Sequence, residues 1–315
     1  MQNNGANMNA KTKLKKNKAR TAFIYISIAY PLLHFLVFNI GMNLGMVYNS
    51  FFQENLIGEK IYCGFYQYAD VFKSFTGLKD QGGMYTYRAV LNTFSLIPLS
   101  LIVNMPLSLL FAYAVFRKYA LYRSFRVVLF VPAVISAVVL CLSFQMALDV
   151  NYGFIALLFK KMGIRVPVYG YFGHEKVAWW SILVFSVWTG ISTNLVYFCS
   201  AMGRLPASVI ESVQLDGATE WTVFGRIVVP MVWPTVVTIS ITLVAGAFGW
   251  YMPSLFLTNG KYSTATLGLI VIQNTQGNNH LGFTSALGVY IAIIGTAVTL
   301  LFKWGLNKFG SQEEY

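Results

Sequence analysis

The residues that could do chemistry are few in this sequence, and they do not cluster. The three histidines, His34, His174 and His280, lie far apart, and the three cysteines lack the spacing of metal ligands or of a disulfide framework. Gly260-Lys261 lacks both the earlier glycine and the following Ser or Thr of a phosphate-binding loop. No Ser-His-Asp set or carboxylate pair stands out. We therefore predict no catalytic residue and no metal site in this chain.

The composition excludes a soluble enzyme. Only 11% of the 315 residues are charged and 56% are hydrophobic, whereas a soluble domain carries about 25% charged residues. The 23 Lys and Arg against 11 Asp and Glu give a net charge of +12, which in a soluble protein would suggest a nucleic-acid partner. In a chain this apolar, we interpret the excess as a signal of membrane orientation and expect no nucleic acid.

Six stretches are long and apolar enough to cross a membrane. A span needs about 20 residues to cross about 30 Å of hydrocarbon, and backbone amides in lipid must be satisfied within the segment, which favours helices. We predict an all-α membrane protein with a transmembrane domain over 21–308. Its six helices are expected at about 22–48, 89–116, 127–148, 177–203, 227–257 and 281–302.

Basic residues set the predicted orientation. The arm 1–20 carries six positive charges within ten residues, and these should stay cytoplasmic because Lys and Arg are retained on that side. Such a run could also bind nucleic acid, but its place directly before a span favours the topological interpretation. With six spans, both termini are cytoplasmic, including the tail 309–315.

The stretch 149–176 departs from this charge rule. It is external in the predicted topology but holds more basic than acidic residues. The charged residues are Lys160, Lys161, Arg165 and Lys176 against Asp149 and Glu175. Two interpretations stay open: a solvated face, which we favour, or a docking patch for an acidic partner.

The predicted spans lack the groups that drive ion-coupled transport. Spans two to five contain no Asp, Glu, Lys, Arg or His at mid-membrane, and carboxylates there are the usual mark of proton or sodium coupling. Neither an Arg-rich voltage sensor nor a repeated channel filter is present. If the chain moves a solute, we expect the energy to come from a source other than ion coupling in these spans.

The loop between the fourth and fifth spans has the pattern of a helix–turn–helix. Pro206 suits the start of a helix that continues from Ala207 to Leu215. Gly217 permits the positive φ that ends a helix, and Thr219 can cap a second helix, which Pro230 stops at the membrane. Two short helices joined rigidly to two spans form a lever. An ordinary amphipathic connector is the alternative.

At these residues the sequence resembles the membrane subunits of ABC importers, specifically carbohydrate-uptake permeases related to the maltose transporter. The family loop reads Glu-Ala-Ala, three residues, Gly, nine residues, Ile-x-Leu-Pro. In the loop 204–230, Glu211-Ser212-Val213 is followed at the same spacing by Gly217 and by Ile227-Val228-Val229-Pro230. The departures replace small or apolar residues with small or apolar ones.

Further elements of the family occur in the expected order. They are Gly64-Phe65-Tyr66-Gln67-Tyr68, Asn92-Thr93, Leu257-Thr258-Asn259-Gly260 and Gly282-Phe283-Thr284-Ser285-Ala286. The resemblance therefore covers most of the chain. It implies the type I ABC importer permease fold and a place in a bacterial cytoplasmic membrane.

The resemblance also implies partners and a coupling site. The partners are a second homologous permease, two ATP-binding subunits that hold ATP and Mg, and an extracytoplasmic sugar-binding protein; this chain itself carries no cofactor. The ATPase-coupling residues would be Glu211, Ser212, Asp216, Gly217, Ala218 and Arg226. In this picture Glu211 contacts the ATPase, and Arg226 ties the second helix to the loop.

Sugar-lining positions are carried over from the same family. They are Ser186, Thr189, Gly190, Thr193, Leu243, Gly246, Ala247 and Trp250, with Tyr251 beside them. Hydroxyl groups and aromatic faces suit a sugar, and we expect an oligosaccharide or polysaccharide fragment. The alternative stays open that the small residues serve close helix packing and that Trp250 anchors the membrane interface.

Three functions compete at this point. We favour an ATP-driven sugar importer, in which ATP binding closes the ATPase pair and moves the coupling helices. The absence of carboxylates from the spans counts against an ion-coupled carrier. The coupling-loop pattern counts against a membrane scaffold that transports nothing.

Overall fold

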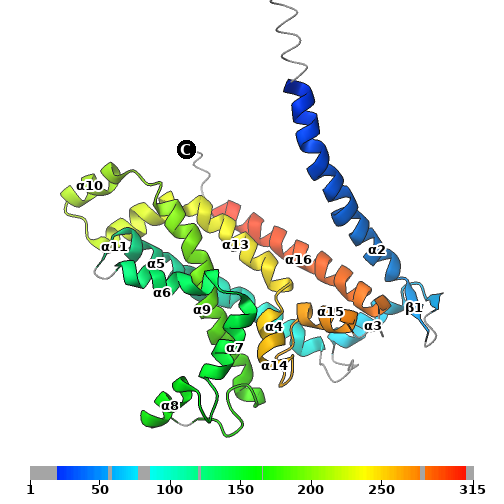
Figure 1. Ribbon diagram of the computed structural model, residues 1–315. Helices are drawn as coiled ribbons and strands as arrows, with labels where there is room; N and C mark the ends of the chain where they lie inside the picture. Colours follow the sequence, from blue (N-terminus) through cyan, green and yellow to red (C-terminus); the bar gives the residue numbers. More distant parts are fainter. Residues whose placement is uncertain are drawn as a thin grey trace, which may run out of the picture.

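The computed structural model describes residues 20–55, 59–76, 86–119, 122–164, 166–276 and 281–309, and the chain is mostly helical (Figure 1). Four helices are long and apolar enough to cross a membrane, and the number rises to six if each of two bent pairs is one span. The four are Arg20–Asn49, Thr86–Phe116, Glu175–Met202 and Leu281–Lys308. Of the residues singled out above, 1–19, Arg165, His280 and 310–315 lie outside the described residues.

The third expected span is sharply bent. Helix α6 (Tyr122–Val134) meets α7 (Ala137–Ala147) at 112°. Pro132 lies in the last turn of α6 and cannot donate a helical hydrogen bond, and Ser136 has an extended ψ of 136°. The expectation of one continuous helix is therefore wrong for this span.

The fifth expected span is also interrupted. The helical stretch Glu220–Met231 meets α13 (Trp233–Phe248) at 70°. Pro230 is accommodated near the start of the short helix α12 (Val229–Met231), so the predicted stop at this proline is wrong and the break falls at Val232. A second interruption follows α13, before α14 (Met252–Thr258).

Three of the membrane-crossing stretches contain π-helical segments. They are η1 (Phe35–Gly41), which precedes α2 (Met42–Asn49); η2 (Leu99–Asn104), which joins α4 (Thr86–Pro98) to α5 (Met105–Phe116); and η3 (Val223–Val228). A π turn inserts an extra residue into a helix and is often found at functional sites.

Short elements cover the end of the molecule opposite the loop 204–230. Strands β1 (Phe52–Glu54) and β2 (Lys60–Tyr62) pair antiparallel and form the described sheet, which the all-α prediction did not anticipate. The short helices at this end are α3 (Tyr66–Phe75), α8 (Phe154–Lys161), α14 and α15 (Leu267–Gln276).

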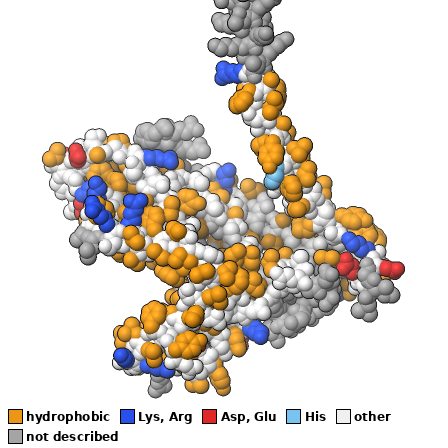
Figure 2. Space-filling model, viewed as in Figure 1, with side chains coloured by type: hydrophobic (Ala, Val, Ile, Leu, Met, Phe, Trp, Pro, Cys, Tyr) orange, Lys and Arg blue, Asp and Glu red, His pale blue; other side chains and the backbone are white. Residues whose placement is uncertain are grey.

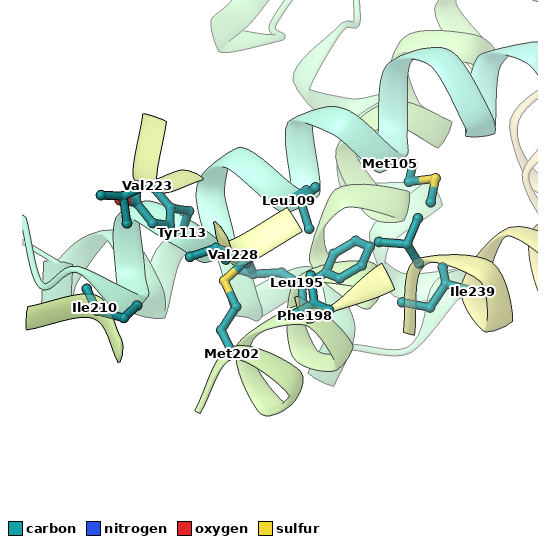
Figure 3. Close-up of a cluster of buried hydrophobic side chains, with 13 residues drawn as sticks. Met105, Leu109, Tyr113, Leu195, Phe198, Met202, Ile210, Val223, Val228 and Ile239 are labelled. Carbon is teal, nitrogen blue, oxygen red and sulfur yellow. The ribbon is translucent and has the colours of Figure 1, made fainter. Parts of the chain in front are cut away.

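The main apolar core joins α5, α13 and α9 (Glu175–Met202). Met105, Leu109, Phe198 and Ile239 are buried there together (Figure 3). By contrast, the first membrane-crossing helix projects from this body, and its most apolar window has no buried residue (Figure 1). Figure 2 shows hydrophobic side chains along its length.

Asn92-Thr93, one of the elements that carried the family resemblance, binds the segment after α14. The Asn92 side-chain amide donates to the carbonyls of Ser263 and Ala265, each at 2.8 Å. The Thr93 hydroxyl accepts from the backbone N–H of Leu267 at 3.0 Å. The Asn-Thr pair therefore fastens the chain after α14 to the second membrane-crossing helix.

Candidate functional site

Helix α10 (Ala207–Leu215) covers the residues predicted to be helical. It starts after Pro206, whose ψ of 125° is extended, and it ends at Asp216. Gly217 follows with φ +79°, a conformation that L side chains rarely adopt. The chain therefore reverses where the sequence predicted a turn.

Helix α10 is anchored on one side and free on the other. Ile210 is only 4% exposed and inserts into the main core beside Tyr113 and Val223 (Figure 3). The predicted coupling residues Glu211, Ser212, Asp216 and Gly217 are exposed, whereas Ala218 packs partly against the core. Leu215 is 89% exposed at the end of α10. The outer face is thus an accessible surface with both acidic and apolar groups.

The second helix of the loop begins at the predicted cap. The Thr219 side chain accepts from the backbone N–H of Thr222 at 3.3 Å, which confirms the predicted N-cap of α11 (Glu220–Thr222). The chain continues through η3 and α12 toward α13. Helical segments therefore run from the loop to Met231, and a 70° bend separates them from α13.

Glu220 is the residue that fixes this loop to the rest of the molecule. Its carboxylate accepts from the Arg117 guanidinium at 2.6 and 3.1 Å and from the Tyr113 hydroxyl at 2.6 Å. Tyr119 donates at 3.0 Å and the Gln214 amide at 3.3 Å. One carboxylate thus connects α10, α11 and the end of α5.

Arg117 and Tyr119 keep the protonation states in which they donate hydrogen bonds to Glu220. The hydrogen bond to Glu220 raises the pKa of Arg117, so the guanidinium stays charged. Burial and the hydrogen bond to Glu220 raise the pKa of Tyr119, which keeps that phenol a neutral donor. Sequence spacing does not reveal this anchor, because Tyr113, Arg117 and Tyr119 lie about a hundred residues earlier in the chain.

Arg226 does not perform the expected tie. Its side chain is exposed, and within the described ranges no hydrogen bond or ion pair is formed by it. The ion pair that joins the second helix to another element is Arg117–Glu220, at 2.6 Å. The described residues therefore show no tie at Arg226, and it is Glu220 that joins this helix to the end of α5.

The predicted sugar-lining residues of α9 have differing surroundings. Ser186 is buried, and its hydroxyl donates to the Ile182 carbonyl at 2.7 Å. The hydroxyls of Thr189 and Thr193 also donate to carbonyls one turn earlier in the helix, and Thr193 is exposed. These hydroxyls retain only their acceptor capacity for a ligand.

Gly190 lies at a close helix crossing. A Cβ atom there would come within 2.6 Å of the Asn104 amide nitrogen, so the absence of a side chain admits Asn104 between η2 and α9. Asn104 is 4% exposed, and its Oδ1 has no hydrogen-bond partner in the described part of the chain. This geometry favours the packing interpretation of Gly190.

The candidates of the fifth span separate into two groups. Leu243 packs against the main core and Ala247 against Leu96 and Leu183, while Gly246 faces open space. Trp250 and Tyr251 lie beyond the end of α13 at Phe248, so helical spacing does not place Gly246 and Trp250 on one face. The Trp250 ring packs edge-on against the Trp179 ring, with 6.4 Å between the two ring centroids.

In the ranges that the structure describes, no group of three or more His, Cys, Asp or Glu side chains is placed to hold a metal ion. The loop and the crossing helices instead form a connected unit that suits the transmission of movement. An accessible helix, a tight turn and an ionic anchor connect three membrane-crossing stretches.

The chain is similar to transport permease proteins over most of its length. It is 25% identical over 307 residues to the arabinooligosaccharides transport system permease protein AraP of Halalkalibacterium halodurans, covering 91% of this chain and 89% of that protein. It is 22% identical over 267 residues to the osmoprotective compounds uptake permease protein GgtC of Synechocystis, covering 81% and 92%.

The fold matches a solved transporter structure. A bacterial ABC transporter involved in the import of the acidic polysaccharide alginate contains a chain with a TM-score of 0.78 at 18% identity, covering 95% of this chain and 100% of that one. Residues 83–307 match the family described as binding-protein-dependent transport system inner membrane component. This multi-pass membrane protein therefore belongs to the binding-protein-dependent transport system inner membrane component family.

Proposed function

We propose that this chain is the transmembrane subunit of an ATP-driven importer for a sugar that an extracytoplasmic binding protein delivers. The observation that carries the proposal is the loop of α10 and α11. It presents an accessible helix that Ile210 fixes to the core and that the hydrogen bond from Gln214 to Glu220 joins to α11. Such a helix suits attachment to a separate ATPase subunit.

The anchors make the loop a coupling device. A pull on α10 is transmitted through Gln214 and Glu220 to Arg117 at the end of α5, and through η3 and α12 to α13. The two states of the ATPase pair would then favour two arrangements of the spans. A ligand shifts such an equilibrium only through its differential affinity for the two states, which ATP binding supplies.

The topology that we propose places α10 and both termini in the cytoplasm of a bacterium. The Arg20 end of the first helix and the end of α16 (Leu281–Phe309) lie on the same side as α10 (Figure 1). The end with α8 and α14 then faces outward, toward the binding protein.

A second permease subunit is part of the proposal. The first membrane-crossing helix leaves its apolar surface outside the body of this chain, and Asn39 and Asn43 lie on it. Amide side chains in a span are stabilised by contacts with another helix. A neighbouring permease would supply such a helix, and two ATP-binding subunits would complete the transporter.

An oligosaccharide is the substrate class that we propose, supported by the relatives named for arabinooligosaccharides. Thr193 and Gly246 are the exposed members of the predicted pathway. Ser186, Gly190 and Ala247 are packed in this structure, so the proposed route passes beside Thr193 and Gly246.

Reconstitution tests the proposal. The chain would be co-expressed with its partner permease, ATPase and binding protein, and sugar-stimulated ATP hydrolysis and sugar uptake would be measured together in proteoliposomes. Glu211→Lys should separate hydrolysis from uptake while the chain still inserts, because Glu211 is exposed on the free face of α10. Full uptake with Glu211→Lys, or uptake in the absence of an ATPase subunit, would contradict the proposal.

A further inference from the structure

A cavity of about 650 Å³ opens at the end of the molecule opposite α10. It lies between the end of α7, the loop that precedes α9, and α14 with the turn after it. Ligand pockets commonly have volumes of about 300–1,000 Å³. The cavity is therefore large enough for a small ligand or for part of a longer one.

The lining combines aromatic faces with amide groups. Tyr169, Phe172 and Tyr262 contribute rings, and Gln145, Asn151 and Asn259 contribute amides. Sugar rings offer C–H faces to aromatic groups and hydroxyls to amides, which both donate and accept hydrogen bonds. The chemistry of the wall thus suits a hydroxyl-rich ring.

One wall is held in a strained backbone conformation. Asn259, Tyr262 and Ser263 have φ values of +53°, +56° and +59° although none is glycine. Such residues persist where the surrounding structure over-determines them, and they cluster at ligand-binding sites. Here Thr258 and Thr264 bond side chain to side chain at 2.6 Å and Asn92 holds the Ser263 carbonyl. These bonds fix Tyr262 at the cavity.

The opposite wall of the cavity is a closely packed turn that contains Gly173. A Cβ atom on Gly173 would lie 2.1 Å from the carbonyl oxygen of Tyr169, so only glycine fits this turn. Tyr171 lies within the same turn and lines the cavity; its hydroxyl is buried and has no partner in the described residues. Burial raises the pKa of Tyr171, so the phenol is a neutral donor.

The floor of the cavity leads toward the proposed route. Phe172, Phe256 and Leu257 line the cavity and pack in one apolar cluster with Trp250 and Phe185. Trp250 is among the predicted sugar-lining residues, and Phe185 adjoins Ser186 on α9. The cavity therefore lies directly outside the helices that would form the pathway, with an aromatic layer between them.

We propose that this cavity is an entry site that binds the terminal ring of an oligosaccharide on its way from the binding protein to the membrane interior. The inference rests on the proposed function. The aromatic layer beneath the cavity would hold the ring outside until the spans rearrange.

Direct binding to the complete transporter in nanodiscs, without binding protein, tests the inference. The probes are an arabinooligosaccharide series and an alginate oligosaccharide series. Their binding is measured by saturation-transfer NMR. Tyr169→Ala should weaken the bound series at least fivefold, and because Tyr169 is 77% exposed the variant should fold. Gln145→Ala is a second exposed variant. Tyr152→Ala is the matched control, since Tyr152 is 66% exposed nearby but does not line the cavity.

The affinity of the binding protein for each variant is measured in parallel. The inference holds if Tyr169→Ala and Gln145→Ala weaken sugar binding while this affinity and the Tyr152→Ala control stay unchanged. It is overturned if the wild type binds neither series, if the variants bind sugar normally, or if only binding-protein affinity falls, which would make the cavity a protein-docking site. Sugar uptake by the wild type, measured separately, shows whether the proposed function itself fails.

Discussion

At the end that carries α10, a charged anchor holds the loop: Glu220 accepts from Arg117, Tyr113 and Tyr119. At the opposite end, neutral groups hold the chain after α14, where the Asn92 amide donates to two backbone carbonyls. The first anchor binds side chains and is partly exposed, whereas the second binds backbone and is buried. The anchor at the α10 end is therefore open to screening by salt, whereas the anchor after α14 is shielded from solvent.

The largest effect should come from breaking the buried anchor. Asn92→Leu leaves the carbonyls of Ser263 and Ala265 without their donor, and each unpaired buried group costs about 1–3 kcal/mol. We expect a large loss of folded permease and a lower Tm of the purified complex. Ser95→Ala is the control, because the Ser95 hydroxyl bonds only the carbonyl one turn earlier. Equal losses in both variants would refute a specific anchor.

Breaking the charged anchor should affect coupling more than folding. Glu220→Ala removes a partly exposed ion pair, worth about 0–1 kcal/mol, and leaves the buried Tyr113 hydroxyl short of a partner, at about 1–3 kcal/mol. We expect a modest fall in Tm with a severalfold drop in sugar uptake per ATP hydrolysed. An unchanged ratio of uptake to hydrolysis would show that Glu220 is only structural.

A smaller effect is expected at the turn between the two helices. Gly217→Ala places a side chain at φ +79°, which costs about 1–2 kcal/mol for an L-residue. We expect sugar-stimulated hydrolysis to fall about two- to fivefold. Gly225→Ala, in helical conformation within η3 and with open space around its Cβ position, should leave the rate unchanged. The same measurement on both variants separates strain from side-chain bulk.

The smallest effect is expected at Arg226. Its exposed side chain lacks a polar partner among the described residues, and exposed substitutions usually change stability by less than about 0.5 kcal/mol. Arg226→Ala should keep the Tm, the hydrolysis rate and the basal uptake of the wild type. A loss of uptake with unchanged Tm would instead place Arg226 in contact with a partner subunit.

The sequence predicted the parts of the fold that local chemistry controls. The helix from Ala207 to Leu215, the turn at Gly217 and the cap at Thr219 depend on residues within one or two turns of each other. The long spans follow from the same logic, because lipid requires helices of a minimum length.

Tertiary packing controls the parts that the sequence did not predict. Pro132 and Ser136 permit a bend, but the 112° between α6 and α7 depends on what packs around them. The pair Arg117–Glu220 joins residues 103 positions apart, and spacing gives no sign of it. The packed state of Gly190 likewise depends on Asn104, which lies on another helix.

Different residues of α10 contact its own chain and form its accessible surface, and this separation bears on how a permease is matched to an ATPase. Ile210 and Gln214 connect the helix to its own chain, while Glu211, Asp216 and Leu215 contribute to its accessible surface. The residues to which we assign the ATPase contact are thus different from those that hold the helix to its own chain. In the proposed coupling, substitutions on the accessible surface would change the fit to an ATPase while the contacts of Ile210 and Gln214 stay in place, so the choice of ATPase and the folding of the permease are separable.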